Sequence, residues 1–177
     1  DLRQGAGFAI PVPFEPVLRF EAKDHSFVGN LEQCNGCGGC RKDAPTMCPT
    51  FQATGDERMS TRGRANIIRA VLEGRLDGDD DPLLSGALDV ALSNCLSCKA
   101  CAVECPSNVN LPLLKAELIH ARHRKHGVPL YARVLSRPDL LGAFGSAVPA
   151  LANVALRNAL FRQLLKYFVR VAPERPL

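Results

Sequence analysis

The cysteines of this chain stand in two groups whose spacing is typical of iron–sulfur ligands. The second group has the pattern C-x2-C-x2-C-x3-C-P, formed by Cys95, Cys98, Cys101, Cys105 and Pro106. The first group has the same three-cysteine core, a longer final gap and the same Cys-Pro ending, formed by Cys34, Cys37, Cys40, Cys48 and Pro49. The second pattern is that of bacterial ferredoxins, in which thiolates hold [4Fe–4S] clusters. Two such clusters need eight thiolates, and the chain has eight cysteines.

The spacing within each group has a physical reason. Three cysteines at three-residue intervals wrap a tight loop around one cubane, so that three thiolates reach three iron atoms. The first loop contains Gly36, Gly38 and Gly39, and glycines allow backbone N–H groups to point toward the sulfide atoms. The proline that ends each group has no N–H and turns the chain away from the site.

The Cys-Pro endings predict crossed ligation, because the cysteine before the proline ligates the other cluster in two-cluster ferredoxins. We expect one cluster on the set Cys34, Cys37, Cys40 and Cys105. We expect the other cluster on the set Cys95, Cys98, Cys101 and Cys48. No cysteine is then left for an open, catalytic iron.

Two other uses of the cysteines fit the pattern less well. Structural zinc also binds Cys-x2-Cys pairs, but it needs four ligands and gives no role to a third cysteine at the next x2 step. Disulfides need an oxidising compartment, and nothing in the sequence suggests secretion. A visible spectrum separates zinc from clusters, since zinc sites are colourless and clusters are brown.

Several polar residues near the cysteines have both a functional and a structural interpretation. Four loop residues could tune a cluster by charge or hydrogen bonding, or could be ordinary solvated positions: Ser97, Lys99, Ser107 and Asn108. Arg62 and Arg64 could reach a cluster, a cofactor or a partner carboxylate, or could be a solvated helix N-terminus. His120, His123 and His126 are spaced like ligands on a helix, but neighbouring Arg and Lys would repel a metal ion, so we expect them in solvent.

Between and after the two groups the sequence predicts helices that must position the cysteines. Ser60-Thr61 is a start signal for a helix over 62–75 that Gly74 can end, with an inward face of Ala65, Ile68, Val71 and Leu72. Asp81-Pro82 pairs a cap with a first-turn proline and predicts a second helix, with an inward face of Leu84, Leu88, Ala91 and Leu92. Asn110 can cap a third helix that ends at Gly127, with Leu114, Leu118 and Ala121 inward.

The two ends of the chain give weaker signals. Residues 1–30 predict an extended arm, with room for one short strand at Val17–Phe20. From residue 130 onward short helices are expected, broken at Pro138 and Pro149. The last expected helix covers 150–170 and has one largely apolar side, which Asn158 interrupts. The apolar residues of this side are Leu151, Val154, Phe161, Leu165 and Phe168.

Charge is distributed unevenly. Residues 1–114 carry 11 Lys/Arg and 15 Asp/Glu, a net charge of −4, whereas residues 115–177 carry 11 Lys/Arg and 3 Asp/Glu, a net charge of +8. Few aromatic residues accompany the basic third, so we do not expect a nucleic-acid surface. With the apolar side of 150–170, the charge predicts instead that this third is an interface. No run reaches the roughly 18 apolar residues of a membrane helix, so we expect no transmembrane span.

The organisation expected from these patterns has three parts. Residues 1–30 form an arm or linker from an upstream domain, residues 31–129 form a dicluster helical domain, and residues 130–177 form a helical extension toward a downstream domain. The chain begins at Asp1 without Met, so we expect an excised piece of a longer polypeptide. No G-x-G-x-x-G after a strand, P-loop or nucleophile elbow is present, so we expect no catalytic residue in this chain.

The chain resembles two groups of iron–sulfur proteins. The long interval from Cys48 to Cys95, with its two helices, is similar to the α-helical ferredoxin fold of heterodisulfide reductases, anaerobic glycerol-3-phosphate dehydrogenase and dihydropyrimidine dehydrogenase. The string Ser-Thr-Arg-Gly-Arg-Ala-Asn at 60–66, the string Glu-Cys-Pro-Ser-Asn-Val-Asn at 104–110 and both cysteine motifs resemble bacterial FAD-linked oxidases with a fused iron–sulfur half, of the D-2-hydroxyglutarate or D-lactate dehydrogenase type. Many such proteins lack a cysteine at the position of Cys37; this chain has it.

The resemblance implies an all-α fold with two [4Fe–4S] clusters in loops between short helices, and a relay function. FAD would lie in an upstream domain or partner and oxidise a 2-hydroxy acid, and the clusters would carry single electrons to a downstream cysteine-rich domain or another acceptor. A separate iron–sulfur subunit of a heterodisulfide-reductase-like or anaerobic glycerol-3-phosphate-dehydrogenase-like complex is the alternative. A zinc-bound structural or nucleic-acid module is a third. The relay is expected in the cytoplasm or at the periphery of the inner membrane.

Overall fold

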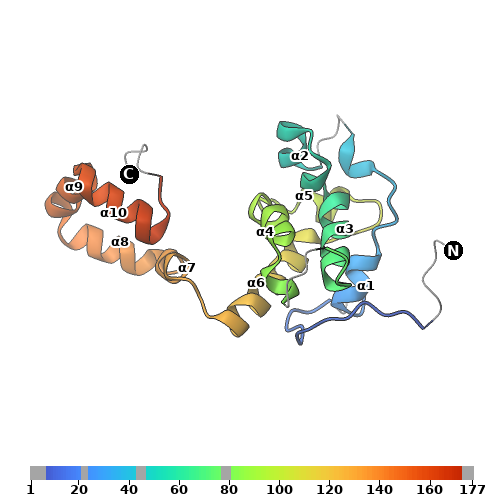
Figure 1. Ribbon diagram of the computed structural model, residues 1–177. Coiled ribbons are helices and arrows are strands. Elements are labelled where there is room, and N and C mark those ends of the chain that lie inside the picture. Colours follow the sequence, from blue (N-terminus) through green and yellow to red (C-terminus); the bar gives the residue numbers. More distant parts are fainter. Residues whose placement is uncertain (1–6, 21–23, 43–46, 77–80, 173–177) are drawn as a thin grey trace. The chain divides into compact units, whose positions relative to one another are not determined.

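A computed structural model describes residues 7–20, 24–42, 47–76 and 81–172 of the chain. Every regular element in this part is a helix and none is a strand (Figure 1), which confirms the all-α fold class. Val17–Phe20 is accordingly not a strand. The chain divides into two compact units, Asp1–Arg122 and His123–Leu177.

The first unit holds all eight cysteines and most of the helices around them. Its α-helices are α1 (Phe27–Glu32), α2 (Pro49–Thr54), α3 (Thr61–Leu72), α4 (Gly86–Ser93), α5 (Ala100–Glu104) and α6 (Leu111–His126), whose last residues pass the boundary. Short 3₁₀ helices cover Gly39–Arg41, Glu57–Met59 and Pro82–Leu84.

Helix α3 is the central element of this unit, and the sequence predicted it. Ser60 caps it, because its side chain accepts a hydrogen bond from the Gly63 N–H at 2.9 Å. The predicted inward face is buried, at Ala65, Ile68, Val71 and Leu72. The helix packs beside α4 (Figure 1), and Gly74 follows its end with a φ of +68°.

The second predicted helix begins later than expected. Asp81 does act as a cap, but of the 3₁₀ turn Pro82–Leu84, and α4 starts only at Gly86 behind a second cap, Ser85. The interruption shifts the helical phase, so Leu83 is buried while the predicted Leu84 is 50% exposed. Leu88, Ala91 and Leu92 are buried as predicted.

Helix α6 follows the prediction closely. The Asn110 side chain accepts the Leu113 N–H at 3.2 Å, and Gly127 follows the helix with a φ of +84°. Its buried residues include the three predicted ones, Leu114, Leu118 and Ala121. They also include Glu117, which no sequence pattern had singled out.

Glu117 of α6 holds the N-terminal arm by two hydrogen bonds. Its carboxylate is fully buried and accepts the backbone N–H groups of Val17 and Leu18 at 2.9 and 2.8 Å. Phe20 stacks edge-on against Phe27 of α1, with ring centroids 5.8 Å apart. The arm therefore packs into the hydrophobic core of the first unit.

The second unit is built from α7 (Leu130–Leu135), α8 (Pro138–Ala147), α9 (Pro149–Arg157) and α10 (Ala159–Val169). The breaks at Pro138 and Pro149 are as predicted, but 150–170 is not one helix. Asn158, the expected polar gap, caps α10 by accepting the N–H groups of Leu160 and Phe161 at 2.9 and 3.3 Å. A polar residue inside an apolar stripe here marks a helix boundary.

None of these four helices contains a buried residue, whereas every α-helix of the first unit except α2 does. Large apolar side chains remain open, among them Phe144, Leu160 and Tyr167 at 75, 77 and 82% exposure. No single helix among the described residues has the length and apolar character of a membrane span. Helices α8 and α9 meet that standard only as a pair, which is bent by 107°.

Candidate metal centre

The two cysteine loops share a backbone course that their sequences do not reveal. In the first loop Gly36 and Gly38 have φ values of +77° and +72°. At the equivalent places of the second loop stand Ser97 and Lys99, with φ values of +54° and +65°. Side-chain-bearing residues adopt this left-handed region at a cost of roughly 1–2 kcal/mol each. Such strain is typical of sites where function dictates the backbone.

Each loop forms one wall of a cavity, and the Cys-Pro cysteine of the other group completes it. The first cavity has an empty volume of about 280 Å³ and is lined by Cys34, Cys37, Cys40 and Cys105. The second has about 300 Å³ and is lined by Cys48, Cys95, Cys98 and Cys101. These are the two sets of four that the sequence assigned to two clusters. Ligation itself remains a prediction.

The donor set of each cavity, four cysteines, is that of a [4Fe–4S] cluster. Tetrahedral zinc would draw four sulfurs to within about 4 Å of one another. Among the described residues, no three His, Cys, Asp or Glu side chains converge in a way that could hold a single metal ion. Each cavity is lined by four cysteines, and four thiolates, one per iron, are what a [4Fe–4S] cluster requires.

The N-terminus of α3 lies between the two cavities. Thr61, which is buried, lines both of them. The next residue, Arg62, donates its backbone N–H to the Cys40 sulfur at 3.3 Å. A helix N-terminus presents free N–H groups and a partial positive charge to anions, so α3 is oriented to stabilise negative sulfur on the first cavity's wall.

Arg62 also reaches the first cavity, where its guanidinium is paired with a carboxylate. Its guanidinium donates to a Glu57 carboxylate oxygen at 2.8 Å and to the Gly36 carbonyl at 3.2 Å. The pKa of Arg62 is raised, first by the hydrogen bond to Glu57 and further by negative charge at Glu57, Cys40 and Cys34. Glu57 also pairs with Arg41 at 3.0 Å.

Arg64 lies at the second cavity and is almost completely buried, at 1% exposure. One of its nitrogens donates to the Cys48 sulfur at 3.2 Å. The others donate to the Thr50 hydroxyl at 2.8 Å and to the backbone carbonyls of Ala91 and Asn94 at 2.8 and 3.1 Å. The sequence had named both arginines as candidates, and the structure places one at each cavity.

Two cysteines of the second cavity have shifted pKa values. Burial would raise the pKa of Cys48, but hydrogen bonds from Thr50, the Phe51 N–H and Arg64, with the Arg64 charge, hold it below its ordinary value. Burial raises the pKa of Cys101 to about 11. Metals bind the thiolate and not the thiol, so the surroundings of Cys48 favour the form that binds a metal, whereas the burial of Cys101 opposes that form.

The remaining sequence candidates are placed as follows. Ser107 lines the first cavity and Lys99 the second. Asn108 has a φ of +56°, and its carbonyl accepts from the buried Asn30 at 3.4 Å, so it serves the packing of α1. Lys115, which sequence reasoning missed, donates to the Cys95 carbonyl at 2.6 Å. No local pattern marks such a long-range contact.

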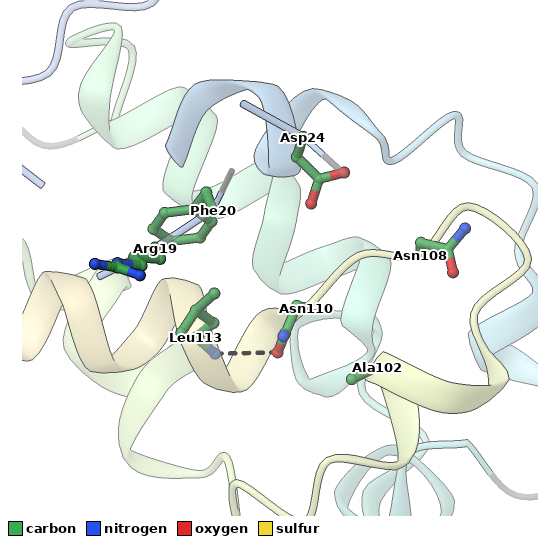
Figure 2. Close-up of a pocket in the computed structure, with 7 residues that line it drawn as sticks. All are labelled: Arg19, Phe20, Asp24, Ala102, Asn108, Asn110 and Leu113. Carbon is green, nitrogen blue, oxygen red and sulfur yellow. Dashed lines mark hydrogen bonds between the residues drawn. The ribbon is translucent and has the colours of Figure 1, made fainter. Parts of the chain in front are cut away.

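Another pocket, with an empty volume of about 580 Å³, lies where the arm meets α5 and α6 and has no cysteine in its lining. Figure 2 shows Arg19 and Phe20 of the arm, Ala102 of α5, and Asn110 and Leu113 at the start of α6 around it. Two of its polar side chains are engaged in packing: Asp24 accepts from Asn30 and Gln33, and Asn110 accepts from Leu113. The pocket therefore adds no ligand set to the cysteine cavities.

Comparisons with known proteins give a match over the cysteine region. The family model of the 4Fe–4S dicluster domain matches residues 30–109, a range that includes all eight cysteines. The chain is 35% identical over 115 residues to the probable glycolate oxidase iron–sulfur subunit of Bacillus subtilis, covering 63% of this chain and 23% of that protein. No solved structure gives a significant match.

Two further relatives extend the similarity. The glycolate oxidase iron–sulfur subunit of Escherichia coli is 30% identical over 149 residues, covering 82% of this chain and 30% of that protein. The D-2-hydroxyglutarate dehydrogenase of Pseudomonas putida is 28% identical over 158 residues, covering 71% of this chain and 15% of that protein. The chain thus spans less than a third of each of these relatives. Residues 30–109 thus match the 4Fe–4S dicluster domain, and the relatives are named glycolate oxidase iron–sulfur subunits and D-2-hydroxyglutarate dehydrogenases.

Proposed function

We propose that this chain is an electron relay that takes single electrons from a flavin and passes them to a downstream acceptor through two [4Fe–4S] clusters. The observation that carries the proposal is the pair of cavities, each lined by four cysteines, that meet at Thr61. In each cavity three cysteines come from one motif and the fourth comes from the other. The eight thiolates would hold the clusters in the crossed arrangement.

The chemistry divides between this chain and its partner. Oxidation of a 2-hydroxy acid removes two electrons and two protons, and a flavin supplies that step. Each bound cluster supplies a site that accepts and releases one electron. The residues of this chain provide the thiolates, the N–H donors of α3 and the charges of Arg62 and Arg64, and they shield the sites with the core of the first unit.

The names of the relatives support a partner that oxidises a 2-hydroxy acid, and they are compatible with two assemblies. D-2-hydroxyglutarate dehydrogenase is a relative of which this chain matches 15%, which favours a relay within a longer polypeptide. Two other relatives are named iron–sulfur subunits, which favours a separate subunit beside a flavoprotein. The length of the natural reading frame distinguishes them.

Turnover by the intact protein tests the relay. With D-2-hydroxyglutarate, D-lactate or glycolate as substrate, it should reduce an artificial acceptor. Cys37→Ala or Cys98→Ala should slow acceptor reduction at least tenfold, while substrate still bleaches the flavin at the original rate. Unchanged acceptor reduction in both variants, or turnover of a hydroxy acid by residues 1–177 alone, would contradict the proposal.

Metal analysis tests the cofactor content independently. Anaerobically prepared protein should contain about eight iron and about eight acid-labile sulfide per chain. A content near four iron, or stoichiometric zinc, would falsify the two-cluster proposal.

A further inference from the structure

The guanidinium of Arg64 is a buried positive charge in the wall of the second cavity. Every polar partner that the structure gives it is neutral or a cysteine sulfur: two backbone carbonyls, the Thr50 hydroxyl and Cys48. The Met59 sulfur lies 3.8 Å from it. None of the ion pairs among the described residues involves Arg64.

A buried charge without a carboxylate is costly unless something negative compensates it. The Cys48 sulfur is in contact with it at 3.2 Å, and three more thiolates would share the same cavity. A negatively charged group bound in this cavity would therefore compensate the Arg64 charge, and that charge would act mainly on this group.

The first cavity differs in this respect. Its arginine, Arg62, is paired with Glu57 at 2.8 Å, and the side chain of Arg62 is 25% exposed. The Arg62 charge there has a carboxylate partner, which it shares with Arg41, and it is partly screened by solvent. The two cavities thus have the same kind and number of sulfur donors but different electrostatic surroundings.

Adding one electron makes a cluster more negative, so a nearby unbalanced cation stabilises the reduced state more than the oxidised state. Hydrogen bonds to the ligand sulfurs act in the same direction, and charge, hydrogen bonding and burial are the means by which proteins set cluster potentials. Resting on the relay function proposed above, we infer that Arg64 makes the second cavity the high-potential end of the pair and therefore the exit side of the relay.

The transfer step balances with one electron. The group held by Cys34, Cys37, Cys40 and Cys105 is oxidised by one electron, and the group held by Cys48, Cys95, Cys98 and Cys101 is reduced by one. The flavin, reduced by the hydroxy acid, is the electron source. No bond between the chain and either group has to form or break during this step.

Other cations reinforce the asymmetry. Lys115, on α6, donates its ammonium to the Cys95 carbonyl at 2.6 Å, and Lys99 lines the same cavity. Both are more exposed than Arg64, so solvent screens them more strongly. Arg64 is consequently the residue whose removal should matter most.

The test is a redox titration of the intact, cluster-loaded protein, followed by electron paramagnetic resonance. Arg64→Gln should lower the higher of two midpoint potentials by at least about 59 mV, a tenfold change in a one-electron equilibrium, and should move the lower one by less than half as much. Arg64→Lys, which keeps the charge, should restore most of the difference. Arg62→Gln is the matched control, because it lies on the same helix but faces the first cavity.

A second measurement avoids dependence on the folding of the Arg64 variants. Cys48→Ser should perturb the signal of the higher-potential cluster, and Cys105→Ser that of the lower-potential cluster. The opposite assignment overturns the inference, and so does a folded Arg64→Gln protein with unchanged potentials, which would make Arg64 a packing residue only. Iron and sulfide contents below eight in the unmodified protein would instead contradict the proposed function.

Discussion

The two cysteine loops follow the same backbone course, but the left-handed positions are glycines in the first loop and Ser97 and Lys99 in the second. The spacing of three cysteines fixes the path of the chain, whichever residues lie between them. What differs is the surroundings: the first loop faces a paired arginine and the second a buried, unpaired one. Ligand geometry and electrostatic environment are therefore specified by separate parts of the chain, the former by the loops and the latter largely by α3.

The largest expected effect concerns which cysteines belong together. Under crossed ligation, Cys48 and Cys98 serve the same cavity, so the double variant Cys48→Ala/Cys98→Ala should lose one cluster and keep about four iron. Cys48 and Cys37 serve different cavities, so Cys48→Ala/Cys37→Ala should lose both clusters. Iron and sulfide analysis distinguishes the pairs.

The two double variants are each other's control, since both contain Cys48→Ala and one further alanine at an exposed cysteine. If the Cys48/Cys37 variant kept four iron while the Cys48/Cys98 variant kept none, ligation would follow each motif and the crossed arrangement would be wrong.

A smaller effect is expected from exchanging the loops' left-handed residues. Gly38→Ala should destabilise the protein by about 1 kcal/mol, because a side chain at φ +72° costs roughly 1–2 kcal/mol and a stiffer unfolded chain returns part of it. The new Cβ would meet only Arg62, at 3.6 Å, so the loss is one of backbone conformation. Lys99→Gly should stabilise the protein by a similar or smaller amount.

Thermal unfolding under anaerobic conditions, followed by circular dichroism, measures both changes. Gly86→Ala is a suitable control, because Gly86 has no positive φ and a Cβ there would meet nothing within 4 Å. A shift of the same sign for Gly38→Ala and Lys99→Gly would show that the loops are not conformationally equivalent.

A smaller effect on the clusters is expected from Glu57→Gln, which removes the carboxylate partner of Arg62 at the first cavity. The lower midpoint potential should rise, so the difference between the two midpoint potentials should decrease. This decrease should be smaller than the one caused by Arg64→Gln, because Arg62 is partly exposed. Unfolding should change by less than about 1 kcal/mol, as for other exposed ion pairs.

Salt provides the internal check on this variant. The shift caused by Glu57→Gln should shrink between low and high ionic strength, since exposed charges are screened. The difference between the two midpoint potentials could instead increase, or stay the same in the variant at every salt concentration. Either result would mean that Arg62 has no electrostatic influence on the first cavity.

Sequence reasoning succeeded where the signal was local. Ser60 and Asn110 cap their helices through side-chain contacts three residues away, and the apolar faces of α3 and α6 follow directly from helical periodicity. It failed where two local signals competed. Asp81 and Ser85 are both caps, and only packing decides which one starts the helix.

The electrostatics of the site could be predicted only in part. The string 60–66 marked Arg62 and Arg64 as unusual for a helix N-terminus, but the burial of Arg64 depends on carbonyls of α4 and its C-cap some 30 residues away. The left-handed Ser97 and Lys99 carry no sequence signal, because neither residue type indicates positive φ.

The expectation that the basic C-terminal third is an interface stays a prediction. Its motivation is stronger in three dimensions than in sequence, since helices α7–α10 bury none of their residues. Their apolar side chains lack the packing that the first unit obtains from residues such as Ile68 and Leu114. Truncating Ile68 should cost about 2–5 kcal/mol, whereas truncating the exposed Leu160 should change stability by less than about 0.5 kcal/mol.

Thr61 is the one residue described here that lines both cavities, and this limits how the protein can be adjusted by evolution or by engineering. A substitution at a shared wall alters the surroundings of both groups at once, so it cannot change one potential alone. Independent adjustment is available one residue further along α3 for the first cavity, at Arg62, and three residues further along for the second, at Arg64. A single turn of helix thus contains one residue that affects both cavities and two residues that each affect one cavity.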